Sequence, residues 1–135
     1  MGSVYTASKI FHFPGKLEAM RRGDVTPPIH VRLKPTNRCQ HRCSYCAYRN
    51  RELPLGESVC ETDELAWPKL KEIIEDIVAM DVRAVRFSGG GEPLCHPHVE
   101  DAVARLAEGE VSIAVLTNGR LLCGPVADAL ARSAT

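Results

Sequence analysis

Residues 36–46 read Thr-Asn-Arg-Cys-Gln-His-Arg-Cys-Ser-Tyr-Cys, and this stretch places Cys39, Cys43 and Cys46 close enough together to bind one small inorganic group. A structural zinc site usually takes four protein ligands in two pairs, and no second pair follows here at a zinc spacing. An iron–sulfur cube normally takes four cysteines, so a set of three leaves one iron open to a small molecule. The spacing therefore favours an iron–sulfur cluster over zinc.

The sequence around these cysteines is strongly basic, although the whole chain has a formal net charge of zero. Nearby cations lower thiol pKa values and offset the negative charge of a thiolate-bound cluster. The same stretch also fits a nucleic-acid-binding patch, with Tyr45 and Tyr48 stacking on bases. Zinc and nucleic acid therefore remain alternatives at this point. Residues 32–51 contain no acid, and their cations are Arg32, Lys34, Arg38, Arg42, Arg49 and Arg51.

The motif Cys39-x3-Cys43-x2-Cys46, with Tyr45 just before the last cysteine, resembles the signature of the radical S-adenosylmethionine (radical SAM) enzymes. The resemblance implies that the three cysteines hold a [4Fe-4S] cluster. It also implies that SAM binds the open iron through its amino and carboxylate groups. Tyr45 would then lie beside the adenine of SAM.

The composition is that of a globular protein, with 44% hydrophobic and 25% charged residues in a chain of 135. No run approaches the ~18 apolar residues that span a membrane, and the N-terminus lacks the apolar centre of a secretory signal. We therefore expect a cytoplasmic protein with no membrane partner. Because no secretory signal is found, we expect metal binding instead of disulfides, and we expect Cys60, Cys95 and Cys123 to be small buried side chains.

Hydrophobic periodicity and turn residues divide the chain into a lead segment, residues 1–28, and a main domain, residues 29–135. The lead should contain a short helix over 16–22 that ends at Gly23. The first long helix of the main domain should begin at Trp67 or Pro68, with Thr62 or Asp63 as its cap and Trp67 as a packing residue. Three- and four-residue spacing gives this helix and the next one an apolar stripe each, and the residues are Leu70, Ile73, Ile74, Ile77 and Val78 in the first and Val99, Ala102, Val103 and Leu106 in the second. Strands are expected over 29–34, 82–88 and 111–117, and helices follow them from about 67 to 78, 99 to 106 and 125 to 131.

The threefold alternation of strand and helix predicts an α/β fold with parallel strands and right-handed crossovers. Alternate strand residues are apolar and should face the helices, whereas the other face should be polar and border a wet lumen. With the resemblance over residues 29–119, this predicts a partial parallel (β/α) barrel of the radical SAM type, carrying the first three of six strand–helix units. The expected apolar set is Val31, Leu33, Val85, Phe87, Ile113 and Val115, and the polar set is His30, Arg32, Lys34, Arg86 and Ser88.

Gly89-Gly90-Gly91-Glu92-Pro93 follows the second expected strand, and its missing side chains suit either close backbone approach to a ligand or a simple tight turn. The run resembles the glycine-rich motif of the radical SAM family. The resemblance implies that backbone carbonyls of Gly89, Gly90 and Gly91 receive the SAM ammonium, while Glu92 braces the turn or accepts a hydrogen bond. We expect a methyl group or a larger side chain at Gly90 or Gly91 to weaken SAM binding. The same change should leave the loop that carries the three cysteines, residues 35–48, unaffected, and we call this segment the cysteine loop.

Thr117-Asn118-Gly119 follows the third expected strand and resembles the ending of that strand in the same family. The resemblance implies a cofactor-binding role for Asn118, although Asn-Gly is also an ordinary turn sequence. In barrels of this kind the loops after the strands build the site. The cysteine loop, the glycine run and the Asn-Gly turn should therefore meet.

The resemblance implies an enzyme that cleaves SAM reductively to a 5′-deoxyadenosyl radical, which abstracts hydrogen from an unidentified substrate. A flavodoxin- or ferredoxin-like protein would donate the electron, and the motifs lean towards members that modify peptides or proteins. No catalytic residue beyond the cluster ligands can be assigned. We expect this chain, with half a barrel, to be inactive alone. Two alternatives are a non-catalytic iron–sulfur or zinc module and a basic nucleic-acid-binding domain, and the glycine run argues against both.

Overall fold

The computed structural model describes residues 11–133, and three short parallel strands form its centre. These are β1 (His30–Leu33), β2 (Ala84–Phe87) and β3 (Ser112–Val115), in the order β1-β2-β3. Val31 lies opposite Val85, and Val85 lies opposite Ile113. The three strand predictions are confirmed, although each strand is shorter than its predicted range.

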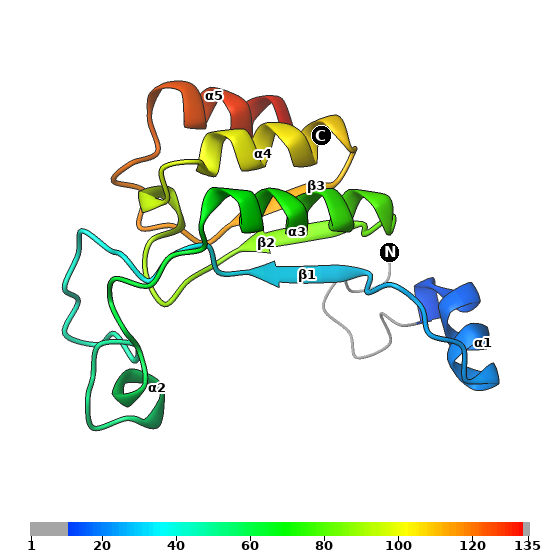
Figure 1. Cartoon of the computed structure of the whole chain (residues 1–135), viewed down its shortest axis with the longest axis horizontal. Coiled ribbons are helices and arrows are strands. Elements are labelled where there is room, and N and C mark those ends of the chain that lie inside the picture. The colour runs from blue at the N-terminus through cyan, green and yellow to red at the C-terminus, as the bar shows by residue number, and fades with distance from the viewer. Residues whose placement is uncertain (1–10, 134–135) are drawn as a thin grey trace, which may run out of the picture.

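Three helices cover one face of this sheet, and they are α3 (Trp67–Ala79), α4 (Val99–Glu108) and α5 (Gly124–Ser133) (Figure 1). Each follows its strand in the sequence, so the predicted α/β fold of parallel strands is confirmed. Among the described residues no helix covers the opposite face (Figure 1). The sheet is therefore packed on one side and open on the other.

The hydrophobic core lies between the sheet and these helices. Val85 and Phe87 of β2 are 0% exposed, and the predicted apolar stripe of α3 is buried at Leu70, Ile74 and Ile77. The packing role of Trp67 is also confirmed, because its ring packs against the core and stacks on His98 with ring centroids 4.8 Å apart. The core residues of α4 are Val99, Ala102, Val103 and Leu106, as the periodicity predicted.

The predicted cap of α3 is wrong. The N-cap residue is Ala66, which makes no side-chain hydrogen bond, and Pro68 occupies the first turn. Proline suits that position because its missing N–H would have no partner there. Asp63 instead belongs to an extended segment, where its carbonyl oxygen accepts a hydrogen bond from the N–H of Asn37 at 2.8 Å.

Two segments project from this layered body (Figure 1). Helix α1 (Pro14–Arg22) lies beyond the amino end of β1, and it ends at Gly23 with a φ of 81°, as its sequence predicted. At the opposite end of β1, the chain between β1 and α3 forms a lobe that includes the short helix α2 (Pro54–Glu57). None of the described helices combines the length and the hydropathy that crossing a bilayer requires.

Leu106 tests the core, because it is 0% exposed in the last turn of α4. Replacing it with alanine should lower the free energy of unfolding by ~2–5 kcal/mol, since the lost methyl groups leave a cavity. The same substitution at Leu122, which is 45% exposed, should cost about 1 kcal/mol or less. Urea denaturation measures both, and equal losses at the two positions would contradict this core.

Candidate active site

The loops that follow the three strands meet at one edge of the sheet, where hydrogen bonds continue past the strand ends. The N–H of Ser88 donates to the carbonyl of Leu33, and the N–H of Leu116 donates to the carbonyl of Phe87, each at 2.9 Å. The N–H of Glu92 then donates to the carbonyl of Arg38 at 2.8 Å. The glycine run and the cysteine loop are therefore in direct backbone contact.

Glu92 also joins the glycine run to the Asn-Gly turn. Its side chain is only 3% exposed. One carboxylate oxygen accepts hydrogen bonds from the N–H of Leu94 at 3.1 Å and from the hydroxyl of Thr117 at 2.8 Å. The other accepts from the N–H of Asn118 at 2.7 Å. Glu92 thus braces its own turn and fixes the turn that follows β3, while its role towards a cofactor stays a prediction.

The glycines themselves pack against protein atoms. A Cβ at Gly90 would lie 2.3 Å from the side-chain oxygen of Asn37, and a Cβ at Gly91 would lie 2.1 Å from the carbonyl oxygen of Arg38. A Cβ at Gly89 would lie 2.2 Å from the carbonyl of Gly91. The expectation that a side chain leaves the cysteine loop unaffected is therefore wrong for Gly91, because it would meet the backbone of Arg38, directly before Cys39. For Gly90 it stays a prediction, because the atoms met there belong to the side chains of Asn37 and Tyr48.

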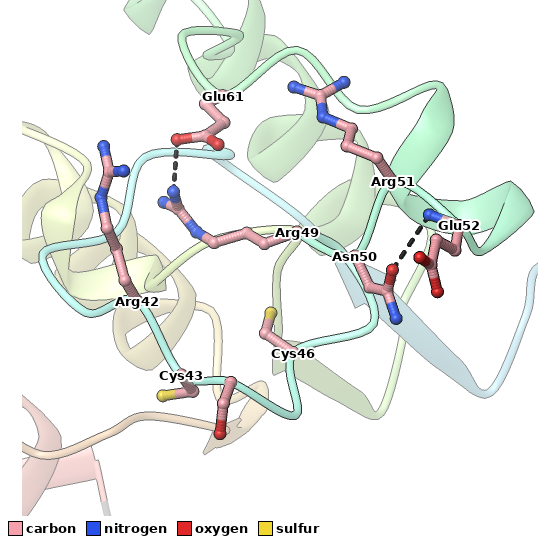
Figure 2. Close-up of a pocket in the computed structure, with 9 residues that line it drawn as sticks. Arg42, Cys43, Cys46, Arg49, Asn50, Arg51, Glu52 and Glu61 are labelled. Atoms are coloured by element: carbon pink, nitrogen blue, oxygen red, sulfur yellow. Dashed lines mark hydrogen bonds and ion pairs between the residues drawn. The ribbon is translucent and has the colours of Figure 1, made fainter.

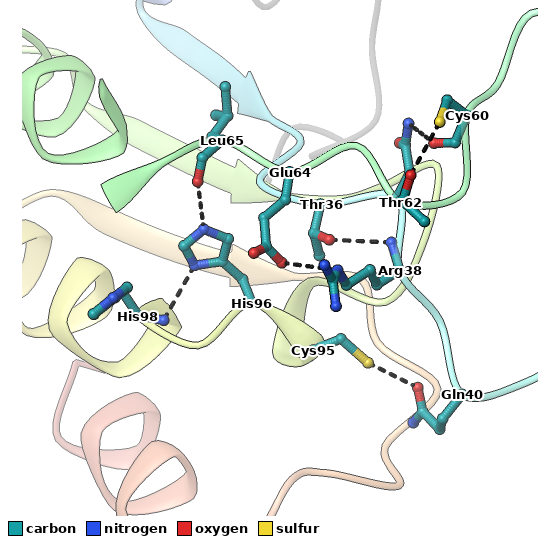
Figure 3. A network of polar contacts seen from close by, with 11 residues as sticks. Thr36, Arg38, Gln40, Cys60, Thr62, Glu64, Leu65, Cys95, His96 and His98 are labelled. Atoms are coloured by element: carbon teal, nitrogen blue, oxygen red, sulfur yellow. Dashed lines mark hydrogen bonds and ion pairs between the residues drawn. The ribbon is translucent and has the colours of Figure 1, made fainter. Parts of the chain in front are cut away.

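Antiparallel pairing closes the base of the lobe. The N–H of Leu65 donates to the carbonyl of Pro35 at 2.9 Å, and Thr36 forms a bridge with Glu64. The side chain of Asn37 donates to the carbonyl of Cys60 at 2.9 Å. We call this pairing of residues 35–37 with 63–65 the neck of the lobe. Figure 3 shows the polar contacts of the neck, in which Arg38, the residue before Cys39, contacts Thr36 and Glu64.

Cys39, Cys43 and Cys46 are free, half-buried thiols on one side of the neck. Cys43 and Cys46 share a turn, in which the N–H of Cys46 donates to the carbonyl of Cys43 at 3.1 Å. Among the described residues no three Cys, His, Asp or Glu side chains are grouped as they would be around a metal ion. The structure therefore brings the three motifs together without gathering the three sulfur atoms, and the cluster-ligand assignment stays a prediction.

The chemistry of this donor set nevertheless fits a [4Fe-4S] cluster. Three thiols free of disulfides lie within one loop, and thiolates are the usual ligands of such clusters. Cys43 and Cys46 line a pocket of about 580 Å³ (Figure 2). The other lining residues are Arg42, Ser44, Arg49, Asn50, Arg51, Glu52 and Glu61.

Acids from outside the basic stretch pair with two of its cations. Arg49 forms an ion pair with Glu61 and donates to the carbonyl of Cys39 at 3.3 Å. Arg38 lies 3.7 Å from Glu64. The absence of acids within residues 32–51 therefore made the site look more positive than it is. In the folded chain Glu61 and Glu64 lie beside the arginines of this stretch and neutralise part of its charge.

Tyr45 lies within the cysteine loop, and Asn118 contacts that loop from the turn after β3. Tyr45 is 88% exposed, and its pKa is raised above the ordinary value, chiefly by its hydrogen bond with Cys43. The side-chain nitrogen of Asn118 lies 3.9 Å from the sulfur of Cys39. Their proposed contacts with SAM stay predictions.

Gln40 was missed by the sequence analysis. Its side chain donates to the amide oxygen of Asn118 at 3.0 Å and accepts a hydrogen bond from the thiol of Cys95 at 3.2 Å. It thereby links the cysteine loop to the loops after β2 and β3. The only signal in the sequence was its position next to Cys39, which does not reveal partners so distant along the chain.

The expectation for the isolated cysteines is wrong. Cys60 and Cys123 are exposed because they lie in loops, at the neck and before α5. Cys95 is half-buried at the end of a short 3-10 helix (Pro93–Cys95). Burial is the main cause that raises the pKa of the Cys95 thiol.

These environments predict the order in which the isolated thiols react. Because a raised pKa leaves less thiolate at pH 8, iodoacetamide should alkylate Cys95 several times more slowly than Cys123. Mass spectrometry of digested protein after timed labelling measures both rates. Equal labelling of the two residues would contradict the burial of Cys95.

Gly91 tests the contact between the glycine run and the cysteine loop. Gly91→Ala should lower the free energy of unfolding by ~1–3 kcal/mol, because the new methyl group meets a backbone carbonyl that must move. Hydrogen exchange at the N–H of Glu92, which bonds that carbonyl, should become faster. Gly15→Ala is the matched control, since a Cβ there meets nothing within 4 Å. Unchanged exchange in the Gly91 variant would refute the contact.

Comparison with known proteins gives the family. The radical SAM superfamily model matches residues 33–134. A GTP 3′,8-cyclase of Chlorobaculum tepidum is 33% identical over 95 residues, covering 69% of this chain and 26% of the relative. A PqqA peptide cyclase of Gluconobacter oxydans is 30% identical over 108 residues, covering 80% of this chain and 28% of the relative. The chain spans 26–29% of the length of the curated relatives it matches.

A solved structure has the same fold. SuiB of Streptococcus suis bound to the precursor peptide SuiA matches with a TM-score of 0.63 at 18% identity, over 96% of this chain and 28% of SuiB. SuiB bound to S-adenosylmethionine matches with a TM-score of 0.62 at 15% identity, over 99% of this chain and 28% of SuiB. From the family match and the meeting of the three motifs, the chain belongs to the radical SAM superfamily, whose characteristic cofactors are a [4Fe-4S] cluster and SAM.

Proposed function

We propose that this chain is the cofactor-binding part of a radical SAM enzyme, with Cys39, Cys43 and Cys46 as the cluster ligands. The observation that carries the proposal is the hydrogen bond between Glu92 and Arg38, because it sets the glycine run against the residue before Cys39. A ligand held by the glycine run would therefore lie next to a cluster in the cysteine loop. SAM needs that adjacency to reach the open iron.

Cys39, Cys43 and Cys46 would hold the [4Fe-4S] cluster, which when reduced would supply the one electron for reductive cleavage of SAM and so the radical chemistry that acts on the substrate. The residues of this chain orient the cofactors. We assign the carbonyls of Gly89, Gly90 and Gly91 to the SAM ammonium and Tyr45 to the adenine. Glu92 acts indirectly, since its carboxylate already accepts three protein hydrogen bonds.

Asn118 is assigned a place at the boundary between the cluster and SAM. Its amide oxygen already accepts hydrogen bonds from Gln40 and from the N–H of Arg120, each at 3.0 Å. Its amide nitrogen is directed at Cys39. Asn118 would therefore hold the cysteine loop against the turn after β3, with SAM bound beside it.

The electron donor would be a small flavodoxin- or ferredoxin-like protein. The lobe beside Cys43 presents the exposed side chains of Arg42 and Arg51, which would attract the acidic surface of such a donor. For the substrate we propose a peptide or protein. The relative named as a PqqA peptide cyclase and the peptide bound to SuiB support this class, while the GTP 3′,8-cyclases point to a nucleotide instead.

Anaerobic reconstitution with iron and sulfide tests the cysteine assignment. Cys43→Ala should lose nearly all bound iron, because three thiolates leave no spare protein ligand. Cys123→Ala is the matched control and should load iron normally, because this exposed thiol lies just before α5 and outside the cysteine loop. Iron and acid-labile sulfide are counted, and electron paramagnetic resonance is recorded before and after SAM is added.

A spectral change on adding SAM, present in the control and lost with Cys43, is the expected outcome. Normal iron content in Cys43→Ala would show that the ligand assignment is wrong. Zinc without labile sulfide in the wild-type chain would instead support a structural metal module.

A further inference from the structure

The open face of the sheet is lined by cations. In β1 the side chains of Val31 and Leu33 pack towards the core, so the alternate residues His30 and Arg32 point to the open face. Lys34 follows with the same alternation, and Arg86 takes the equivalent position in β2. No acidic residue occupies an open-face position in the three described strands. We call Arg32, Lys34 and Arg86 the cationic face.

The two arginines of this face are direct neighbours. The strand register pairs Arg32 with Arg86, and neighbouring strands lie ~4.7–4.9 Å apart. Like charges placed directly opposite each other across strands are destabilising. Two adjacent guanidinium groups therefore need a counter-charge.

Within residues 11–133 that counter-charge is not supplied by an acid. Arg38 and Arg49 each have an acidic partner, whereas none of the ion pairs among these residues involves Arg32, Lys34 or Arg86. The Nε atom of Arg86 is buried without a hydrogen-bond partner. A buried donor without an acceptor is costly, and a guanidinium group is shaped to bind the two oxygens of an oxyanion.

Arg32 is held in position by neutral groups. It donates to the hydroxyl of Ser88 at 3.2 Å and lies 3.5 Å from the hydroxyl of Tyr48. The Lys34 ammonium lies 4.9 Å from the centre of the Tyr48 ring. These contacts orient the cations without neutralising them.

Tyr48 also connects this face to the cofactor-binding loops. It belongs to the cysteine loop, and a Cβ at Gly90 would lie 3.6 Å from its ring. The cationic face therefore borders the place where the cysteine loop meets the glycine run. A molecule bound there would lie beside the proposed cofactors.

We propose that Arg32 and Arg86 together bind an oxyanion of the substrate, a carboxylate or a phosphate group, with Lys34 adding to the attraction. That the bound oxyanion belongs to the substrate rests on the proposed function, because it follows from the position of the cationic face beside the proposed SAM site. The paired guanidinium groups would bind the anion bidentately and turn the rest of the substrate towards the glycine run. Binding itself requires neither the cluster nor SAM.

The test titrates the full chain with sodium pyrophosphate and, separately, with triglutamate, at constant ionic strength, by isothermal calorimetry. Arg32→Gln and Arg86→Gln should each weaken binding of the preferred probe by roughly tenfold or more, as expected for a lost charge-assisted hydrogen bond. Arg83→Gln is the matched control, because its exposed side chain at the amino end of β2 carries the same charge away from this face. It should weaken binding less than about twofold. Preference for pyrophosphate would indicate a phosphate group, and preference for triglutamate a carboxylate.

Three results would overturn the proposal. The first is the absence of probe binding by the wild-type chain. The second is an equal loss of binding in the Arg83 and Arg86 variants, which would indicate general surface attraction. The third is competition by SAM for the probe in the reconstituted protein, which would assign the arginines to the SAM carboxylate. Cys43→Ala should keep probe binding. A wrong cluster assignment would therefore show in the iron content alone, and a wrong oxyanion site in the calorimetry alone. Circular dichroism of each variant confirms that the sheet is folded.

Discussion

The buried carboxylate of Glu92 accepts hydrogen bonds from Leu94, Thr117 and Asn118, and the N–H of the same residue donates to Arg38. A carboxylate taken out of water must have such partners, because desolvation of an unpaired charge is expensive. Each hydrogen bond to it is worth roughly 1.5–3 kcal/mol. One residue thereby fixes the relative positions of three loops, and those loops carry every cofactor-binding residue assigned here.

The layered body followed from the sequence because hydrophobic burial is read directly from periodicity. The stripe of α3 and the alternation of β1 and β2 depend only on which residues are apolar and how they are spaced. The residue at which a helix starts depends on whether a possible cap residue pairs with the helix or with another part of the chain. Asp63 had the right chemistry for a cap, but its backbone pairs with Asn37, and the helix begins four residues later. That competition involves residues far apart in the chain, so a local pattern could not reveal it.

The site was predictable as a set of motifs and not as a set of contacts. Residue types and spacing identified the cysteine loop, the glycine run and the Asn-Gly turn, and parallel strands brought their ends together. The packing of Gly90 against Asn37 and the pairing of Arg49 with Glu61 require the folded path of the chain. Cys60 and Cys123 show the same limit, since a cysteine is buried or exposed according to its element and not its type.

The neck has a consequence for how this protein can vary in length. Pairing of residues 35–37 with 63–65 closes the lobe before the chain enters α3. A change in length in the outer part of the lobe therefore does not alter the positions at which the chain leaves the sheet and enters the helix. For a closed flexible loop, doubling the length costs only about 0.6 kcal/mol. Insertions or deletions between Arg51 and Val59 should therefore accumulate during evolution, while the segments on either side of the neck keep their spacing. The outer lobe is therefore the part of the described structure that can change in length without rearranging the sheet.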